Sequence, residues 1–375
     1  MDNKRRPPNP QFLTSRDGSF FYRFRLLGLA ASLAVAFMLS CSTYPTDPGG
    51  RDLYELESVW QYLKTYSFWQ DKVPAGAFEY GSPREMMKSV YDTLKGSYYT
   101  KYYNDPSHSS SGLLGKSSAA DTVATVGWDS VTASIAYLRI SEFSIDDSST
   151  YFQFLNILPY LRKFSTIIID LIDNGGGGIA TTDAIINSIL PVATPYILET
   201  YRRYGQSTHS AVTIPWDTIK TQNGQDPALK NKRYAVLMNG GSASASEILV
   251  AALKDGLAHA SSGDTVVLIG DTTYGKGIGQ MHISRTSWNR PDLLVTFMRM
   301  KGISGRTGDY QRKGIAPDVF VADDPTHLAH LTEAVKILEP TARLNKRTLL
   351  QKQLRPSGGL PPEAYLVATP ENVPK

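Results

Sequence analysis

The chain of 375 residues contains one cysteine and carries little net charge. A single cysteine excludes an internal disulfide and a multi-cysteine metal site. The formal charge is +4, from 39 basic and 35 acidic residues, and residues 1–40 hold six of the basic and two of the acidic ones. The rest of the chain is therefore neutral, with 33 residues of each sign. Because no basic field remains to bind phosphates, a nucleic-acid partner is not expected.

The composition is otherwise that of an ordinary globular protein. Hydrophobic residues make up 41% of the chain and charged residues 20%, which excludes disorder, collagen and coiled coil as the main state. The length is sufficient for one large domain or two smaller ones with a buried core.

A short apolar run lies near the start of the chain, over residues 26–39. Basic residues precede it and small residues follow it, which predicts a secretory signal over 1–40. The run is shorter than the ~20 residues of a membrane span. Met-Leu-Ser-Cys at 38–41 resembles the bacterial lipobox, which implies a lipid on Cys41 and anchoring on the periplasmic side of the envelope. Ser42 favours the outer membrane. The alternative is a plain signal peptide or short anchor with an incidental cysteine.

Alternating strand and helix patterns follow a proline- and glycine-rich linker and predict an α/β core. The expected segments are a linker at 41–51, a helical region at 52–104, a loop at 105–126, the core at 127–340 and a proline-rich tail at 341–375. Predicted strands cover 131–140, 166–172, 234–238, 265–270, 281–284 and 293–300. Predicted helices cover 52–66, 83–94, 150–164, 180–190, 244–254 and 326–338.

The segment 236–247 passes from a buried strand through two glycines to serines that open an apolar helix. Amides at a helix N-terminus point outward and can stabilise a developing oxyanion beside such a serine. Serines before a helix, with Glu247 close by, are also ordinary N-caps, so both interpretations stay open at this point.

The segment 270–280 reads Gly-Asp-Thr-Thr-Tyr-Gly-Lys-Gly-Ile-Gly-Gln. It is not a phosphate-binding loop, because Gly277 stands where that motif needs Ser or Thr to hold magnesium. Lys276, between two glycines, can enter a pocket where desolvation favours the neutral amine, and there it can act as a general base. A solvated turn lysine is the alternative.

A third segment, 167–178, ends a buried strand with Asp-Asn and four glycines. Glycines let backbone amides approach a substrate closely. A flexible strand-to-helix turn would have the same composition.

Together these segments resemble the C-terminal processing (tail-specific) protease family, serine peptidases with a Ser-Lys pair. Residues 239–247 match the family's Asn-x-x-Ser-Ala-Ser-Ala-Ser-Glu, and 314–318 match its Gly-Ile-x-Pro-Asp. Residues 170–177 match Asp-Leu-Arg-x-Asn-x-Gly-Gly in part, and 136–140 resemble its Gly-Tyr-Ile-Arg-Ile strand. The resemblance implies a mixed sheet flanked by helices, with a ClpP/crotonase-like protease core and a small N-terminal helical region.

The resemblance also implies an activity and its residues. The implied function is a serine endopeptidase that hydrolyses peptide bonds of envelope proteins through an acyl-enzyme, with no cofactor or metal. Its partners would be protein or peptide substrates and, through the lipid anchor, the membrane. The implied roles are nucleophile for Ser244, general base for Lys276, orientation of the lysine for Gln280, oxyanion donors for Ala245 and for Gly176 or its neighbour, and structural support for Asp255.

Two other functions remain open. One is a catalytically silent family member that binds peptides or envelope proteins, and the other is a scaffolding envelope lipoprotein. No Gly-x-Ser-x-Gly elbow exists, which disfavours a Ser-His-Asp hydrolase. His327, His330 and Glu333 recur every three residues, a spacing that favours structural or solvated roles over a metal site.

The sequence departs from the expected patterns in four places, and one of them is Met38, where the lipobox usually has Leu. Ile172 replaces the family's Arg and Gly175 its Pro, so a more mobile oxyanion loop is expected. Lys276 lies 32 positions after Ser244, a longer spacing than usual, and the extra residues near 256–264 are expected to form a surface loop. Only positions 104–130 are left for the family's PDZ domain, fewer than the ~50 residues a domain needs, so that domain is expected to be absent.

Overall fold

The structure is a computed structural model that describes residues 53–82, 85–86, 101–102, 124–145, 149–205, 210–260, 263–283 and 293–341. The chain divides into two units between Tyr54 and Glu55, and nearly all of the described residues belong to the second. The predictions for the signal, Cys41, the linker, the tail, most of the 105–126 loop and most of the 83–94 helix lie outside the described residues. No helix within the described ranges is long and apolar enough to cross a membrane.

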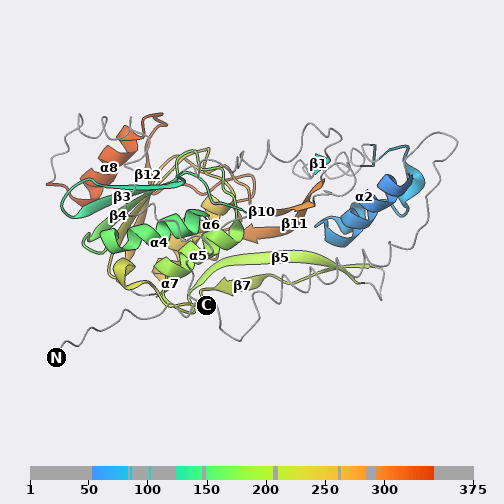
Figure 1. Ribbon diagram of the computed structural model, residues 1–375, viewed down its shortest axis with the longest axis horizontal. Helices are drawn as coiled ribbons and strands as arrows, with labels where there is room; N and C mark the ends of the chain where they lie inside the picture. Colours follow the sequence, from blue (N-terminus) through green and yellow to red (C-terminus); the bar gives the residue numbers. More distant parts are fainter. Residues whose placement is uncertain are drawn as a thin grey trace, which may run out of the picture. The chain divides into compact units, whose positions relative to one another are not determined.

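A six-stranded sheet in the order β12-β9-β8-β4-β3-β2, called here the central sheet, has helices packed on its two faces (Figure 1). Its first five strands are parallel, and β2 pairs antiparallel with β3. The strands are β2 (Val126–Ser130), β3 (Ile135–Ile140), β4 (Thr166–Asp170), β8 (Arg233–Met238), β9 (Thr265–Gly270) and β12 (Val319–Phe320). The continuous apolar runs that predicted buried strands belong to this sheet, as expected for parallel strands covered on both faces.

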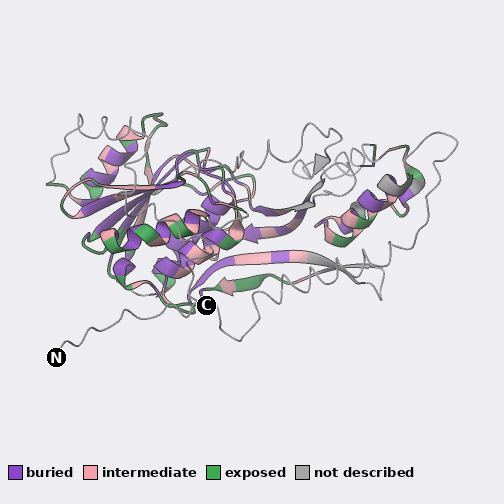
Figure 2. Cartoon of the chain, viewed as in Figure 1, coloured by how far each residue is buried: buried purple, intermediate pink, exposed green. Residues whose placement is uncertain are grey.

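Successive side chains of β4 point to opposite faces of the sheet, as strand geometry requires. Ile167 and Ile169 join the buried cluster formed with α4 (Ser149–Leu161), α5 (Ile179–Ile189) and α6 (Ala245–Ala251). Ile168 joins the cluster formed with α8 (Leu328–Leu338). Figure 2 shows these central strands as buried. Asp170, two residues after Ile168, therefore lies on the α8 face.

A second sheet is antiparallel, in the order β1-β11-β5-β6, with β10 on β11 and β7 on β5. Its strands are β1 (Lys101–Tyr102), β5 (Pro195–Gly205), β6 (Ser210–Thr213), β7 (Asp217–Lys220), β10 (Ile278–Ile283) and β11 (Leu293–Lys301). The sequence predicted only β10 and β11. The side chains of β7 are mostly exposed, so this edge strand lacks the apolar alternation on which such a prediction rests.

The N-terminal helical region contains α2 (Leu53–Tyr66), close to the predicted bounds, and the 3-10 turns η1 (Gln70–Lys72) and η2 (Ala77–Glu79). The amide of Phe68 donates to the carbonyl of Thr296 at 2.8 Å, which ties this region to β11. A further 3-10 turn, η5 (Pro227–Leu229), precedes β8.

Two predicted elements differ from the structure. The strand predicted over 131–140 begins only at Ile135, because 131–134 form the turn of the β2–β3 hairpin. The helix after Ser244 continues beyond α6 as a π-helical turn, η6 (Ala252–Gly256), and then as α7 (Leu257–Ala260). Part of the expected surface loop is therefore helix. A π-turn accommodates extra residues inside a helix.

Helix α5 and strand β5 are joined by a buried carboxyl group. Tyr196 donates its hydroxyl proton to Asp183 at 2.9 Å. Burial raises the pKa of Asp183 to about 7, and the neighbouring Glu199 adds to the rise. The folded state holds the proton of Asp183 more tightly than the unfolded chain does, so the protonated carboxyl group stabilises the fold. This contribution to the free energy of unfolding is complete below about pH 4 and is lost as the pH rises through 7.

Asp183→Asn keeps an acceptor for Tyr196 and removes the charge. We expect the melting temperature to rise by ~3 °C at pH 8 and to change little at pH 4. Thermal unfolding at both pH values measures this difference. Glu142→Gln, at an exposed site, is the control. A shift of equal size at both pH values would contradict the buried-carboxyl account.

Candidate active site

Ser244 stands at a sharp turn between β8 and α6. Its backbone has φ 57° and ψ −114°, a region that non-glycine residues rarely adopt. Strained backbone of this kind is concentrated at functional sites. The side chain makes no capping hydrogen bond to α6, although Ser244 is the N-cap residue. The structure therefore places this serine at a helix N-terminus without using its hydroxyl as a cap.

The two flanking serines have structural contacts. The hydroxyl of Ser242 donates to the carbonyl of Leu171 at 2.7 Å and accepts the amide of Asn239 at 3.0 Å. The hydroxyl of Ser246 donates to the carbonyl of Asn174 at 2.8 Å. Both side chains are fully buried. They fasten residues 171–178, called here the glycine loop, to the nucleophile turn, so Ser244 is the one of the three serines left for chemistry.

Glu247 joins the turn that carries Ser244 to the turn that carries Lys276. One oxygen, Oε2, accepts the amide of Ser244 at 2.9 Å and the amide of Lys276 at 2.7 Å. The other, Oε1, accepts the amide of Gly275 at 2.7 Å and the hydroxyl of Thr273 at 2.6 Å. Burial raises the pKa of Glu247, and these hydrogen bonds oppose the rise. Two backbones 32 residues apart thus meet on one carboxylate.

The lysine turn is supported from its other side by the Gly-Ile-x-Pro-Asp segment. Thr273 donates its amide to the carbonyl of Ile315 at 3.1 Å, and its hydroxyl accepts the amide of Ile315 at 2.7 Å. The carbonyl of Gly275 accepts the amide of Arg312 at 2.7 Å. Gly275 has φ +89°, and a Cβ there would lie 2.8 Å from the amide nitrogen of Gly314. No other residue fits this turn without strain.

Gln280 lies on β10, four residues after Lys276, and both side chains are partly buried. The pairing of β10 with β11 shifts register between Gly279 and Gln280. A β-bulge of this kind changes the direction of a side chain next to a site.

The glycine loop packs directly against Ser244, the residue predicted to be the nucleophile. Gly176 has φ +102°, and a Cβ at this position would lie 2.8 Å from the Cβ of Ser244 and 2.9 Å from the amide nitrogen of Ala245. Gly177 forms a β-bridge with Phe143. A Cβ on Gly177 would clash with the Phe143 carbonyl. Side chains are therefore excluded at both positions.

The structure brings together the two amides predicted as oxyanion donors, but only one of them already donates a hydrogen bond within the protein. The amide of Ala245 opens α6 and donates no hydrogen bond within the described part of the chain. The amide of Gly176 donates to Oδ1 of Asn174 at 2.9 Å. The amides of its neighbours, Gly175 and Gly177, have no acceptor among the described residues.

Sequence reasoning gave no role to Asn174, and it considered Glu247 only as a neighbour of possible N-cap serines. Asn174 is fully buried and donates its side-chain amide to the carbonyl of Ile140 at 2.8 Å. Its own carbonyl accepts the amide of Ala243 at 3.0 Å as well as the Ser246 hydroxyl. Both residues belong to the motifs quoted above, so the motifs contained the signal. The contacts of Asn174 restrain a loop that the substitutions at 172 and 175 led us to expect to be mobile.

Asp255 has the structural role that was predicted for it. Its carboxylate accepts the amides of Ile303 at 2.9 Å and Ser304 at 3.1 Å, and the hydroxyls of Ser304 and Thr307. It holds the turn that follows β11.

The region that contains these residues matches a known family. The model of peptidase family S41 covers residues 134–321, about half of the chain. The chain belongs to peptidase family S41. The resemblance inferred from the motifs is thereby confirmed.

Relatives of this S41 chain include proteins named for C-terminal processing. This chain is 29% identical over 206 residues to the carboxyl-terminal-processing protease of Synechocystis sp. The match covers 54% of this chain and 42% of that protein. The chain is 27% identical over 188 residues to the carboxy-terminal processing protease CtpB of Bacillus subtilis, covering 50% and 34%. The matches thus span less than half of the length of these relatives.

The fold also resembles a solved structure, that of a lipoprotein from Streptococcus agalactiae. The TM-score is 0.52 at 15% sequence identity, and the match covers 81% of this chain and all of that one. This likeness supports the mixed α/β fold expected from the sequence.

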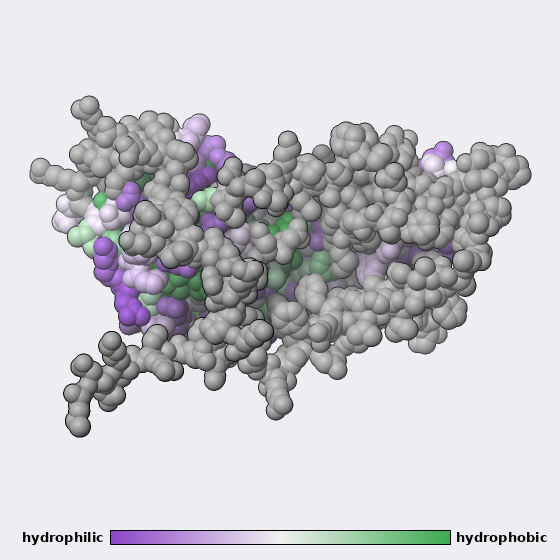
Figure 3. Space-filling view, in the orientation of Figure 1, coloured by the Kyte–Doolittle hydropathy of each residue, from purple (hydrophilic) through white to green (hydrophobic). Residues whose placement is uncertain are grey.

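An exposed aromatic residue lies next to the lysine of this S41 site. Tyr274 is 51% exposed, and its amide donates to the carbonyl of Ser242 at 3.0 Å. Because of this exposure, Tyr274 presents an apolar ring to solvent beside the turn that carries Ser244. On the face drawn in Figure 3, described hydrophobic residues are interspersed with hydrophilic ones.

Across the ranges that the structure describes, no group of three His, Cys, Asp or Glu side chains could hold a metal ion. His327 instead contacts Asp170, and Glu333 pairs with Lys336 on α8.

Glu247→Gln tests the junction between the two turns. The amide nitrogen of glutamine would face two backbone or hydroxyl donors that now bind a carboxylate oxygen. We expect a loss of about 2 kcal/mol in the free energy of unfolding, measured in urea, because buried donors are left without acceptors. Glu142→Gln serves as the exposed control. A variant as stable as the parent would show that Glu247 does not hold the turns together.

Proposed function

We propose that this S41 chain is a serine endopeptidase in which Ser244 is the nucleophile and Lys276 the general base. The observation that carries the proposal is the Glu247 carboxylate, because one of its oxygens accepts the amides of both residues. Support comes from the strained backbone of Ser244, the open amide of Ala245 and the close packing of Gly176.

The chemistry follows from these positions. Neutral Lys276 removes the proton from the Ser244 hydroxyl, and the oxygen attacks the carbonyl carbon of a peptide bond. The carbon–nitrogen bond then breaks, and the lysine gives the proton to the leaving amine. Water, deprotonated by the same amine, hydrolyses the acyl-enzyme. Gln280 orients the lysine.

The oxyanion needs two donors. The Ala245 amide supplies one, and the glycine loop supplies the other. Because Asn174 occupies the Gly176 amide, the second donor is a neighbour, Gly175 or Gly177, unless Asn174 releases Gly176. Each such donor contributes ~3 kcal/mol to transition-state stabilisation.

Proteolysis of unfolded casein tests the Ser-Lys pair. The purified protein should cleave casein, and Ser244→Ala and Lys276→Ala should each lower the rate at least ~1,000-fold, since the nucleophile or its base is lost. Lys313→Ala, an exposed lysine on a neighbouring turn, is the matched control and should retain activity. Cleavage that persists in Ser244→Ala would reject this nucleophile.

The second candidate is a catalytically silent member that binds peptides or envelope proteins. The hydrogen bond between Asn174 and the Gly176 amide favours it, because that amide is not open to an oxyanion. The exposed ring of Tyr274 would serve peptide binding in either case. Binding of casein peptides without cleavage by any form of the protein would support this candidate.

We further propose that the chain is lipid-anchored through Cys41 in a bacterial envelope and acts there on protein or peptide substrates. The lipobox-like residues 38–41 support this, and the S. agalactiae neighbour is itself described as a lipoprotein.

Detergent partition tests the anchor. Expressed in a bacterial host, the full chain should partition into the detergent phase of Triton X-114 and carry fatty acyl chains detectable by mass spectrometry. Cys41→Ser should move the protein to the aqueous phase, whereas Ser42→Ala should not. An unmodified parent protein would refute lipidation.

A further inference from the structure

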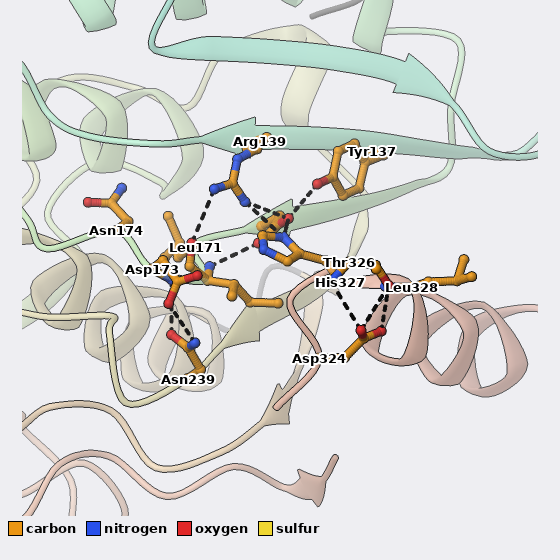
Figure 4. A network of polar contacts seen from close by, with 12 residues as sticks. Tyr137, Arg139, Leu171, Asp173, Asn174, Asn239, Asp324, Thr326, His327 and Leu328 are labelled. Atoms are coloured by element: carbon orange, nitrogen blue, oxygen red, sulfur yellow. Dashed lines mark hydrogen bonds and ion pairs between the residues drawn. The ribbon is translucent and has the colours of Figure 1, made fainter. Parts of the chain in front are cut away.

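Three side chains converge on Asp170, the last residue of β4, on the α8 face of the central sheet (Figure 4). Oδ2 of Asp170 accepts the Tyr137 hydroxyl, Nη1 of Arg139 at 3.0 Å and Nδ1 of His327 at 2.7 Å. Asp170 is fully buried, whereas Arg139 and His327 are partly exposed. These four residues are called here the Asp170 cluster.

The cluster holds the start of the glycine loop. Oδ1 of Asp170 accepts the amide of Ile172 at 2.9 Å, and Nη2 of Arg139 donates to the carbonyl of Ile172 at 3.4 Å. Both backbone polar groups of Ile172 therefore bind the cluster. Asn174, two residues later, holds the Gly176 amide and binds Ser246. A displacement at Ile172 would pass through this short segment to the proposed oxyanion donors.

The electrostatics of the cluster favour a charged carboxylate. Burial would raise the pKa of Asp170, but the hydrogen bond from His327 and the charge of Arg139 outweigh it and lower the pKa. A buried anion of this kind depends on its donors, because removing one leaves charge without compensation. The other titratable groups that face the cluster are His330, whose pKa is lowered by burial, together with Asp323 and Asp324.

His327 has two partners that require opposite states of one atom. Its Nδ1 lies 2.7 Å from Oδ2 of Asp170 and 2.9 Å from Nη1 of Arg139. Arginine is always a donor, so Nδ1 can accept from Arg139 only when it carries no proton, and can donate to Asp170 only when it does. The two hydrogen bonds exclude each other. The position of this proton decides whether His327 donates to Asp170 or accepts from Arg139, while Arg139 binds Asp170 in both cases.

The backbone around His327 is arranged to present the ring. His327 has φ 56° and ψ 3°, the left-handed region, where a β-carbon is unfavourable. Asp324 holds this turn by accepting the amides of Thr326 at 3.0 Å and Ala329 at 2.9 Å. Strain retained in this way points to a use for the residue it positions.

The same segment touches the nucleophile turn. Asn239 donates its side-chain amide to Asp323 at 3.1 Å and to Asp173 at 2.8 Å. The segment that leads into α8 therefore contacts the strand end before Ser244, and Asn239 at that strand end also binds Asp173 of the glycine loop.

We propose that His327 and Arg139 are positioning residues that, through Asp170 and Ile172, set the glycine loop for oxyanion binding, and that the proton on His327 selects between two arrangements of this support. The inference rests on the proposed peptidase function. Neither residue touches substrate.

Kinetics of conservative variants test the proposal. His327→Asn tolerates the left-handed backbone and donates to Asp170, but does not titrate. Arg139→Lys keeps the charge but cannot span Asp170 and Ile172. We expect kcat on a casein-derived peptide to fall about 10-fold in each, with KM within about twofold, because oxyanion contacts act in the transition state. Lys336→Ala, on the exposed side of α8, is the control and should match the parent.

The pH profile separates positioning from mere support. From pH 5.5 to 9, the parent's kcat should show a step that His327→Asn removes and Lys336→Ala retains. A profile with the same steps in parent and His327→Asn would overturn the role of the proton. If both cluster variants have a lower thermal stability but an unchanged kcat, the cluster has only a structural role. That result would overturn the proposal.

Hydrogen exchange keeps the test independent of peptidase activity. The hydrogen-bonded amides of the loop should exchange at least about 10-fold faster in His327→Asn and Arg139→Lys than in the parent, while those of α5 stay unchanged. These amides are those of Ile172, Asp173, Asn174, Gly176 and Gly178. If the parent itself fails to cleave and Ser244→Ala behaves identically, the proposed function falls, and exchange still decides the positioning role. Unchanged exchange in the loop would overturn it.

Discussion

The site depends on one buried carboxylate. Glu247 accepts the amides of Ser244, Gly275 and Lys276 and the hydroxyl of Thr273. Backbone donors buried without an acceptor are destabilising, so this acceptor stabilises the two turns against each other, together with the hydrogen bond from the Tyr274 amide to the Ser242 carbonyl. The parallel strands β8 and β9 deliver both turns to the same edge of the sheet, and Glu247 fixes their separation there.

Around this junction, the serines of the nucleophile segment have different tasks. Ser242 and Ser246 bind carbonyls of the glycine loop, and the hydroxyl of Ser244 is left without a capping bond. The glycine loop is therefore held by Ser242 and Ser246, on either side of Ser244, and, at its start, by Asp170 and Arg139. The first support sets the loop against Ser244, and the second connects it to the α8 side of the sheet.

Much of the central sheet could be predicted from the sequence, because 166–170, 234–238 and 265–270 are continuous apolar runs bounded by glycine or polar turns. The second sheet could not. Strand β5 mixes charged and aromatic residues, and β7 is largely exposed, so neither shows the period of a buried strand. The π-turn after α6 was missed as well, since a helix and a loop insertion have the same composition there.

The sequence by itself determined the protease family and the identity of Ser244 and Lys276 as candidates, because these depend on residue types at short spacing. Only the tertiary structure decided which serine lacks a structural partner and that Asn174 occupies the Gly176 amide. Only the tertiary structure showed that His327 contacts Asp170, which lies 157 positions earlier in the chain. Hydrogen bonds between distant residues depend on the packing of whole elements, and no local pattern encodes them.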